Sequence, residues 1–407
     1  MSVASRSWLE GPASRGDSSG PISEVRPLII RFGAMGDMIL LTGLMRALHR
    51  RFGSPCDVLS SGGWTEPLLR GNPDLGELRL IKSRKTPYPL SPEQWHLVSW
   101  LRQRPRGPIY ICDAYAQDKI RWLLGRAGVS PADCVFYSGS MFAEVSHWFD
   151  VWKKFAGMSP ENYSAYPGNP ESYPRIPQLS VAADAQHAAQ GFLDEHRIAA
   201  PVVLVQPGNK RTLKRGRLGA LGDDKAWPTA NWIELCGKLL LLRPDAHIVL
   251  CGVPSEQPLL SDIAAGSNSE RVHALGEDLP IPRLLALMLR ADSMISIDSG
   301  PAHAAAALGC PTVVLYGRNR PENWLPRGSP ATPVAGLEAP PGRPRAVEEI
   351  SVDRVVRAWR SLSQHLPLTS DIPDGATDHA YAGRFNIPGA RPSRTNAVPF
   401  VPLKNKS

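Results

Sequence analysis

A glycine-containing turn that ends in an acidic residue directly follows the chain's first apolar segment. Gly33-Ala-Met-Gly36-Asp37 stands between a run of apolar residues and a stretch with helical periodicity. Two glycines let a backbone turn sharply and approach a ligand. Asp37 has two interpretations: a helix N-cap, which stabilises a helix by about 0.5–2 kcal/mol relative to Ala, or a carboxylate that takes a proton from an acceptor hydroxyl. Because the third glycine of G-x-G-x-x-G is absent, the turn does not indicate a dinucleotide-binding fingerprint.

A second turn with chemical potential is Asp298-Ser-Gly-Pro-Ala-His303, which lies between an apolar run and an alanine-rich stretch. Ser299 and Gly300 fall at the start of the predicted helix, where free N–H groups and the positive end of the helix dipole receive phosphate. His303 lies in the first turn and adds a further donor. Capping by Asp298 or Ser299, with a packed His303, accounts for the same residues, so both interpretations stay open.

Basic residues gather in two places. The loop 209–217 follows a predicted strand and holds the basic residues Lys210, Arg211, Lys214, Arg215 and Arg217. A charge run is usually a solvated surface, but its place at the end of a strand favours phosphate contact. A second basic group is a candidate site for an anionic acceptor and comprises Lys82, Arg84, Lys85, Arg102, Arg104, Arg106, Lys119 and Arg121.

Short apolar runs alternate with helical stretches, which predicts an α/β fold with open parallel sheets. The predicted strands are residues 27–32, 109–112, 202–206, 247–251, 294–297 and 312–316. The predicted helices are a segment after Asp37 and residues 119–126, 232–242, 284–290, 302–308 and 352–365. Ligands of such sheets bind at the carboxyl ends of the strands, where the turns described above are expected to lie.

The distribution of proline and of periodic segments predicts two domains and two tails. Residues 166–180 are rich in proline and without periodicity, so we expect an interdomain linker there. The predicted division is a disordered tail at 1–25, a first domain at 26–165, the linker at 166–180, a second domain at 181–350, a final helix at 351–366 and a disordered tail at 367–407.

Composition limits the classes of protein that the chain can be. The 407 residues are 43 % hydrophobic, which is enough for sizeable cores, and the net charge of +8 indicates an anionic partner. Six scattered cysteines form no C-x-x-C pair, so neither a zinc site nor a disulfide framework is expected. No secretory signal and no long apolar run are visible, which predicts a cytoplasmic protein.

The sequence lacks the motifs of several kinds of active site. The chain has no Walker G-x-x-x-x-G-K-[ST] and no H-E-x-x-H. It also has no D-x-D pair that would hold a metal–diphosphate, so we expect no metal site. A nucleotide-diphosphate leaving group would then be neutralised by Lys, Arg, His and helix N-termini.

Three blocks of the chain, in order, resemble the heptosyltransferases of glycosyltransferase family 9, which act in lipopolysaccharide core synthesis. The first is residues 28–48 with the Gly33–Asp37 turn. The second is Val205-Gln-Pro-Gly208 with the later Asp224-Lys225-Ala-Trp227-Pro228, and the third is residues 298–317 with the D-[ST]-G-x-x-H pattern. The loop between Gly208 and Lys225 is longer and more basic than in the family.

The resemblance implies a GT-B fold, in which two Rossmann-like domains face each other across a cleft. It also implies an inverting, metal-independent transfer of a heptose from ADP-heptose to the lipopolysaccharide inner core. The acceptor would be lipid-linked, the donor would be a substrate rather than a cofactor, and the final helix would pack back against the first domain. We expect a monomer that meets its acceptor at the anionic inner leaflet of the membrane.

The same resemblance assigns residue roles. Asp37 would be the general base for the acceptor hydroxyl, and Lys225 would contact the diphosphate. Glu256 would accept hydrogen bonds from the ribose hydroxyls. The phosphates would be held by Ser299, Gly300 and His303 in a loop set by Asp298, with Lys210 and Arg211 as further nucleotide contacts.

Two alternative functions remain. A nucleotide-sugar epimerase of GT-B type would use the same nucleotide site without an acceptor. A non-catalytic nucleic-acid-binding protein would explain the positive charge, but no helix-turn-helix, RRM or KH signature is present, and the basic residues fall in strand-end loops.

Overall fold

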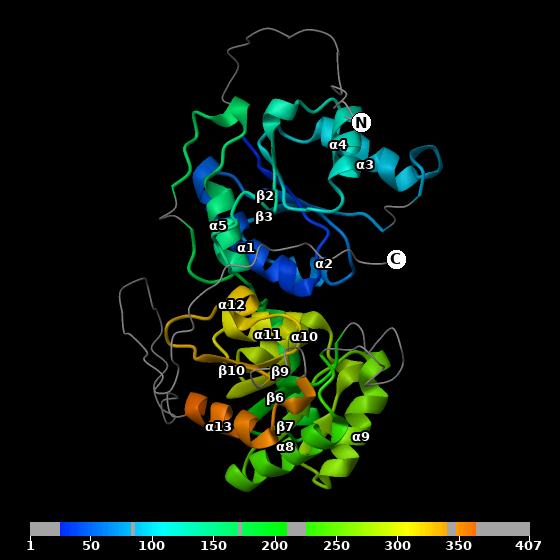
Figure 1. The fold of residues 1–407 in the computed structure, drawn as a ribbon. Helices are drawn as coiled ribbons and strands as arrows, with labels where there is room; N and C mark the ends of the chain where they lie inside the picture. The colour runs from blue at the N-terminus through cyan, green and yellow to red at the C-terminus, as the bar shows by residue number, and fades with distance from the viewer. Residues whose placement is uncertain (1–24, 83–85, 170–172, 210–224, 340–346, 364–407) are drawn as a thin grey trace.

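The chain folds into two α/β domains, one above the other in Figure 1. The computed structural model describes residues 25–82, 86–169, 173–209, 225–339 and 347–363. The first domain is built on a five-stranded sheet of order β3-β2-β1-β4-β5, and the second on a six-stranded sheet of order β11-β10-β9-β6-β7-β8. Neighbouring strands run parallel in both sheets. The α/β class that the sequence predicts is confirmed.

The first sheet is covered on both faces, which explains why its central strand contains only apolar residues. Its strands are β1 (Leu28–Ile30), β2 (Cys56–Ser60), β3 (Leu75–Leu80), β4 (Ile109–Ile111) and β5 (Cys134–Phe136). Its helices are α1 (Met35–Phe52), α2 (Thr65–Leu69), α3 (Pro92–Gln103), α4 (Gln117–Arg126) and α5 (Trp148–Gly157), with η1 (Tyr88–Leu90), η2 (Pro131–Asp133) and η3 (Glu161–Tyr163) as 3-10 turns. Helices α1 and α5 pack on one face, and α3 and α4 on the other.

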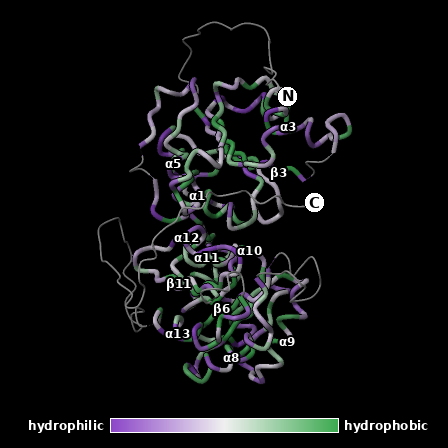
Figure 2. Tube along the Cα trace, in the orientation of Figure 1, coloured by the Kyte–Doolittle hydropathy of each residue, from purple (hydrophilic) through white to green (hydrophobic). Residues whose placement is uncertain are grey.

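The second sheet has the same layered construction. Its strands are β6 (Val202–Gln206), β7 (His247–Leu250), β8 (Val272–Ala274), β9 (Ser293–Ile297), β10 (Thr312–Tyr316) and β11 (Val334–Glu338). Its helices are α6 (Ala183–Glu195), α8 (Thr229–Leu242), α9 (Gln257–Ser267), α10 (Ile281–Met288), α11 (Gly300–Ala307), α12 (Pro321–Trp324) and α13 (Val352–Ser363), with η5 (Pro254–Glu256), η6 (Gly276–Asp278) and η7 (Val347–Glu349). Helices α6, α10 and α11 cover one face, and α8, α9 and α13 the other. Figure 2 shows the hydrophobic residues concentrated along the central strands.

The two domains share contacts beyond the linker. The ring centroids of Trp148 in α5 and Trp324 in α12 lie 5.6 Å apart. His147 Nε2 lies 2.8 Å from the Leu325 carbonyl oxygen. Arg327 Nη2 lies 2.6 Å from Asp150 Oδ2. The start of α5 and the segment from α12 to Arg327 therefore join the domains beside the cleft.

The described part of the linker packs on the first domain. Tyr173 is buried with its ring 5.2 Å from that of Phe149 in α5. The backbone N–H of Gln178 donates to Thr42 Oγ1 of α1 at 2.7 Å, and its carbonyl accepts from Asn72. Hydrogen bonds of this kind anchor residues that have neither helix nor strand.

Helix α13 corrects one expectation, because it packs on the second domain and not on the first. The apolar stripe Val355, Trp359 and Leu362 joins the core formed with α8. Trp359 Nε1 donates to Ser293 Oγ of β9 at 2.8 Å. Lys238 of α8 pairs with Asp353 at 2.6 Å. A helix with one apolar face covers the nearest open sheet face, and here that face belongs to β9 and β10.

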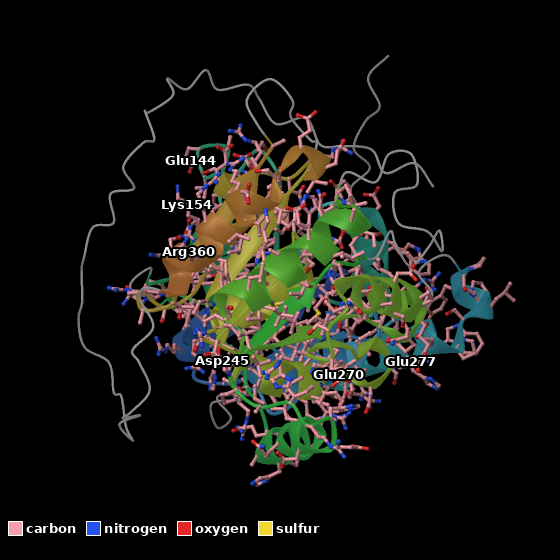
Figure 3. All side chains as sticks on the ribbon, turned by 90° about the horizontal axis from the view of Figure 1, so that it is seen from below. Glu144, Lys154, Asp245, Glu270, Glu277 and Arg360 are labelled. Atoms are coloured by element: carbon pink, nitrogen blue, oxygen red, sulfur yellow. The ribbon has the colours of Figure 1, made fainter. Side chains whose placement is uncertain are left out.

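The predicted tails at 1–25 and 367–407 lie outside the described residues, apart from Val25. Within the described part of the chain, no helix combines the length and apolarity needed to cross a membrane. The six cysteines carry no disulfide, and burial raises the pKa of Cys236 and Cys251 to about 12. Charged side chains lie on the outside, as Figure 3 shows for Asp245 and Glu270.

Candidate active site

Asp37 lies in the first turn of α1, and its carboxylate has two described partners. Oδ2 accepts a hydrogen bond from the Ala34 N–H at 2.8 Å. Ala34 is the N-cap residue and Asp37 is the third residue of α1, so the interpretation of Asp37 as the N-cap is wrong. Oδ1 lies 2.7 Å from Arg31 Nη2. The side chain remains 19 % exposed, so a substrate hydroxyl can still reach it. A hydrogen bond to the N-cap residue and access to a ligand are therefore compatible in one residue.

Arg31 follows β1 directly and is a functional candidate that the sequence analysis passes over. Its Nη1 donates to the Cys112 carbonyl at 2.7 Å, and its guanidinium lies 5.6 Å from the Trp152 ring centroid. Burial disfavours the charged guanidinium, but the Asp37 carboxylate outweighs that effect and raises the pKa of Arg31. The sequence signal that could have identified Arg31 is its position, since it is a basic residue at the end of the strand that precedes the Gly33–Asp37 turn.

Both glycines of this turn are required by close approach. A Cβ on Gly33 would lie 2.5 Å from the Asp37 Cβ. A Cβ on Gly36 would lie 3.1 Å from the His303 Cδ2, which belongs to the other domain. The turn is therefore packed against Asp37 on one side and against α11 on the other.

The N-termini of α1 and α11 meet across the domain boundary. A Cβ on Gly300 would lie 2.8 Å from the Met35 Cβ and 3.1 Å from the Gly36 backbone nitrogen. The two loops singled out in the sequence, Gly33–Asp37 and Asp298–His303, are thus brought together by the fold. Each helix directs its N–H groups and the positive end of its dipole toward this junction.

His303 is buried at the junction, 3 % exposed, and its ring lies 6.3 Å from that of Trp324. Burial lowers the pKa of His303, although Asp298 and Asp37 act in the opposite direction. Its Nδ1 has no hydrogen-bond partner among the described residues. Burial therefore favours the neutral imidazole, and Nδ1 itself is buried at this junction.

Asp298 organises the loop before α11. It accepts hydrogen bonds from Lys225 Nζ at 2.6 Å and from Asn319 Nδ2 at 2.6 Å, both at Oδ2. Its carbonyl also accepts from Lys225, at 2.9 Å. Ser299 points its hydroxyl to Ser296 Oγ at 2.9 Å and does not cap the helix. The expected set Lys225, Asp298, Ser299, Gly300 and His303 is therefore gathered at one helix start.

Glu256 lies at the carboxyl ends of β6 and β7, beneath two glycines. A Cβ on Gly208 would lie 2.1 Å from Glu256 Oε1, and one on Gly252 would lie 3.0 Å from Oε2. Oε2 accepts from the Val253 N–H at 3.1 Å, whereas Oε1 has no partner among the described residues. Burial raises the pKa of Glu256 to about 7, and the hydrogen bond from Val253 only partly opposes this.

The sequence predicts basic residues as nucleotide contacts and as acceptor contacts, and the two groups have different outcomes. Lys210 and Arg211 lie outside the described residues. Arg104, one of the candidate acceptor contacts, is an internal residue instead. Its side chain is 4 % exposed and its Nε lies 3.0 Å from Asp57 Oδ2. Since a buried ion pair of this kind is already neutralised, Arg104 is removed from the candidate anion site.

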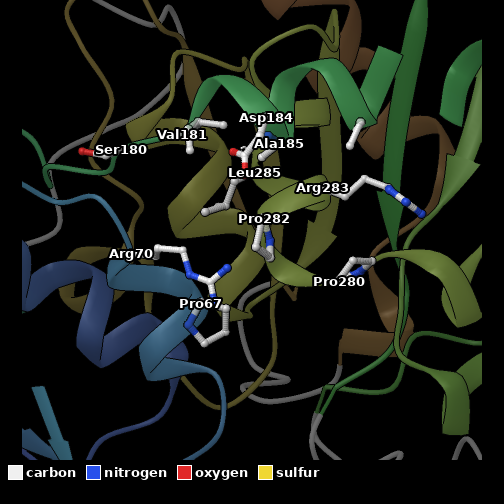
Figure 4. A pocket seen from close by; sticks show the side chains of 12 residues that line it. Pro67, Arg70, Ser180, Val181, Asp184, Ala185, Pro280, Pro282, Arg283 and Leu285 are labelled. Atoms are coloured by element: carbon white, nitrogen blue, oxygen red, sulfur yellow. Dashed lines mark hydrogen bonds between the residues drawn. The ribbon is translucent and has the colours of Figure 1, made fainter. Parts of the chain in front are cut away.

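A pocket between the domains lies apart from these residues (Figure 4). It has a volume of about 180 Å³ and is lined by residues of α2, α6 and α10. Arg70 and Arg283 line it, but Arg70 pairs with Glu66 and Arg283 with Asp278. The pocket contains none of the residues of the loop junction, so the loop junction remains the candidate site.

Comparison with known proteins shows a similarity to one family of glycosyltransferases. Residues 169–345 match the model of glycosyltransferase family 9 (heptosyltransferase). Lipopolysaccharide heptosyltransferase 3 of Escherichia coli is 25 % identical over 296 residues, which are 72 % of this chain and 83 % of that protein. Lipopolysaccharide heptosyltransferase 1 of Salmonella typhimurium is 34 % identical over 125 residues, which span 29 % of this chain and 38 % of that protein.

The chain is similar to glycosyltransferase family 9 over residues 169–345, which are less than half of its length. It is a glycosyltransferase, and this class disfavours both the epimerase and the nucleic-acid-binding alternative. The match begins in the linker and runs through the second domain, so it includes Lys225, Glu256 and the loop before α11.

Solved structures confirm the GT-B architecture of this glycosyltransferase. The E. coli ADP-heptose lps heptosyltransferase II has a TM-score of 0.64 at 20 % identity, covering 84 % of this chain and 99 % of that chain. The E. coli heptosyltransferase WaaC with ADP has a TM-score of 0.58 at 19 % identity, covering 83 % and 99 %. Within the described residues, no group of three His, Cys, Asp or Glu side chains is arranged to hold a metal ion.

Proposed function

We propose that this glycosyltransferase transfers a heptose from ADP-heptose to the lipopolysaccharide inner core with inversion at the anomeric carbon. The observation that carries the proposal is the junction of α1 and α11. It places the carboxylate of Asp37 from the first domain near a phosphate-type helix start from the second. The relatives named for lipopolysaccharide heptosyltransferase activity support the sugar and the acceptor class.

In the proposed reaction, the acceptor oxygen attacks the anomeric carbon from the side opposite to the ADP. The new carbon–oxygen bond forms as the bond to the β-phosphate breaks, and Asp37 takes the hydroxyl proton. Each oxygen of Asp37 keeps a second lone pair besides those used by Arg31 and Ala34, so the carboxylate can act as a general base.

The departing ADP needs positive potential, which we propose comes from protein groups without a metal ion. The α11 N-terminus supplies N–H groups and its dipole, and Lys225 supplies a full charge from a position beside Asp298. His303, in the first turn of α11, is a further proposed contact of the phosphates. Lys210 and Arg211 complete the proposed nucleotide contacts, and they belong to the loop that precedes Lys225.

In this proposal each domain binds one of the two substrates. Residues 26–165 bind the acceptor sugar, and residues 181–350 bind the nucleotide sugar. Glu256 accepts hydrogen bonds from the ribose hydroxyls, since its free Oε1 lies under Gly208 at the end of β6. The WaaC structure with ADP, whose fold is similar, supports a nucleotide in a site of this architecture. We further propose that the enzyme works as a cytoplasmic monomer on a lipid-linked acceptor.

The Asp37→Asn variant tests the proposal. Removing the base should lower kcat by about 10²–10⁴-fold while the Kd for ADP stays near the wild-type value. The Asp118→Asn variant is the matched control, because Asp118 is an exposed carboxylate in the first turn of α4 in the same domain. Wild-type turnover by Asp37→Asn would remove Asp37 from the mechanism.

Donor class is tested separately by thermal stabilisation with nucleoside diphosphates. ADP should raise the unfolding temperature, and UDP and GDP should not, because only ligands that bind the native state stabilise it. A larger shift with UDP would overturn the ADP-heptose assignment while leaving the glycosyltransferase family unchanged.

A further inference from the structure

The first domain carries a continuous group of mostly exposed aromatic and apolar side chains that no described element covers. We call it the aromatic patch and define it as Tyr88 and Leu90 of η1, Trp95 of α3 and Trp122 of α4. Leu90 is 73 % exposed, Trp95 44 % and Trp122 41 %. Large apolar side chains that are contiguous and exposed mark an interaction surface more often than scattered ones do.

Contacts join Tyr88, Trp95 and Trp122 of the aromatic patch. The rings of Tyr88 and Trp122 lie 5.1 Å apart at 77°. Trp95 Nε1 donates to the Tyr88 carbonyl at 2.7 Å. The guanidinium of Arg126 lies 4.5 Å from the Tyr88 ring centroid and 4.2 Å from that of Trp122. The patch is therefore one preassembled surface with a cation at its centre.

Leu90, Trp95 and Trp122 lie outside the domain core and the interdomain contact, whereas Tyr88 is half-buried and packs against the core. The buried faces of α3 and α4 contribute Leu97, Leu101, Ile120 and Leu123 to the core beneath the sheet. Helices α1 and α5, which approach the second domain, pack on the opposite sheet face. Figure 1 shows α3 and α4 on the part of the first domain that is remote from the second. The second domain therefore leaves the patch open to an external partner.

The charge around the aromatic patch is positive. The charged residues counted here are Lys82 and those of α3 and α4. The basic side chains of this set are Lys82, Arg102, Lys119, Arg121 and Arg126. The acidic side chains of the same set are Glu93 and Asp118. Tryptophan and tyrosine favour the interface between lipid headgroups and acyl chains, and Lys and Arg are attracted to anionic lipids. The aromatic side chains and the positive charge both fit an anionic membrane surface.

We propose that the aromatic patch docks the first domain on an anionic membrane surface. This inference rests on the proposed function, because a lipid-linked acceptor would be delivered at that surface to the domain that carries Asp37. Leu90, Trp95 and Trp122 insert at the headgroup level, and Arg126 with its basic neighbours contacts lipid phosphates. The patch specifies where and in which orientation the enzyme meets the bilayer.

Vesicle co-sedimentation tests the proposal with the full chain and no substrate. Wild-type protein should sediment with vesicles of phosphatidylglycerol and phosphatidylcholine, and much less with phosphatidylcholine alone. The triple variant Leu90→Gln, Trp95→Gln, Trp122→Gln should bind the anionic vesicles at least tenfold more weakly. The control is Leu241→Gln, Leu242→Gln, since both leucines are exposed on α8 of the second domain, and it should bind like wild type.

Activity measurements separate this proposal from the proposed function. Transfer to a delipidated, soluble acceptor should be equal in wild type, triple variant and control, which also shows that the variants are folded. Transfer to acceptor embedded in anionic vesicles should fall only in the triple variant. Vesicle binding by the triple variant at the wild-type level would overturn the docking surface. A dimeric wild-type protein together with a monomeric triple variant would show instead that the patch binds a second copy of the chain. Absence of transfer to the soluble acceptor would count against the proposed function alone.

Discussion

The guanidinium of Arg31 holds the carboxylate of Asp37 at 2.7 Å, from a position fixed by the Cys112 carbonyl. This relationship ties the candidate base to the end of β1, so its orientation does not depend on the helix alone. Arg31 is thus a positioning residue for Asp37.

Replacing Arg31 should lower the rate of transfer without changing nucleotide affinity. In Arg31→Met, the Asp37 carboxylate loses the partner that orients it at the end of β1. Loss of orientation should lower kcat by about 10–100-fold, while the Kd for ADP stays at the wild-type value. Arg31→Lys keeps a donor for Asp37 and should recover part of the lost kcat. Initial rates and ADP titrations check both outcomes.

The matched control is Arg46→Met, which breaks another arginine–aspartate pair of α1. Arg46 Nε lies 2.6 Å from Asp74 Oδ2, away from the α1 N-terminus. This variant should lose some stability and keep the wild-type kcat. A wild-type kcat in Arg31→Met would show that Arg31 does not position Asp37.

Glu256 should make nucleotide affinity depend on pH. Its pKa is raised to about 7, so it loses its proton as the pH rises through that value. Only the ionised carboxylate accepts hydrogen bonds at both oxygens, as two ribose hydroxyls require. The affinity for ADP should therefore increase by up to about tenfold between about pH 6 and pH 8. Isothermal titration calorimetry at several pH values measures it.

The Glu256→Gln variant should bind ADP more weakly at high pH and lose this pH dependence. Glu270→Gln is the control, because Glu270 is exposed in the same domain (Figure 3). An ADP affinity that falls as the pH rises, or a pH dependence that survives in Glu256→Gln, would rule out the ribose contact.

The fit between the two helix N-termini predicts that Gly300→Ala impairs activity. The added Cβ would lie 2.8 Å from that of Met35, so the domains must move apart. A shift of this kind misplaces Asp37 relative to the nucleotide and should lower kcat/KM by about 10²-fold. Gly237→Ala in α8 is the control, since nothing lies within 4 Å of its added Cβ. It should keep full activity and gain up to about 1 kcal/mol of stability. Equal kcat/KM in both variants would contradict a tight junction.

The sequence predicts the loops of the site better than it predicts their partners. Asp37, Ser299 and Gly300 are visible because glycine-containing turns after apolar strands must lie at the carboxyl edge of a parallel sheet. The contact of Gly36 with His303 joins segments remote in the chain, and local patterns carry no information about it. The same holds for α13. Its apolar stripe shows that it covers a sheet but not which one, since either sheet would bury the stripe equally well.

The interdomain contact around His147 should weaken in acid, because the protonated ring loses the Nδ1 acceptor for the Phe149 N–H and carries a charge beside Arg327. Burial lowers the pKa of His147 from 6.5 to about 4, and Arg327 acts in the same direction. The folded state therefore favours the neutral ring, and this contribution is complete above about pH 6.5 and is lost as the pH falls toward 4. Solution scattering should show the domains separating over this range in wild type and in the exposed-histidine control His187→Gln. His147→Gln can still donate to Leu325 but does not titrate, so it should stay closed to lower pH. Identical opening curves for both variants would assign the acid sensitivity to other groups.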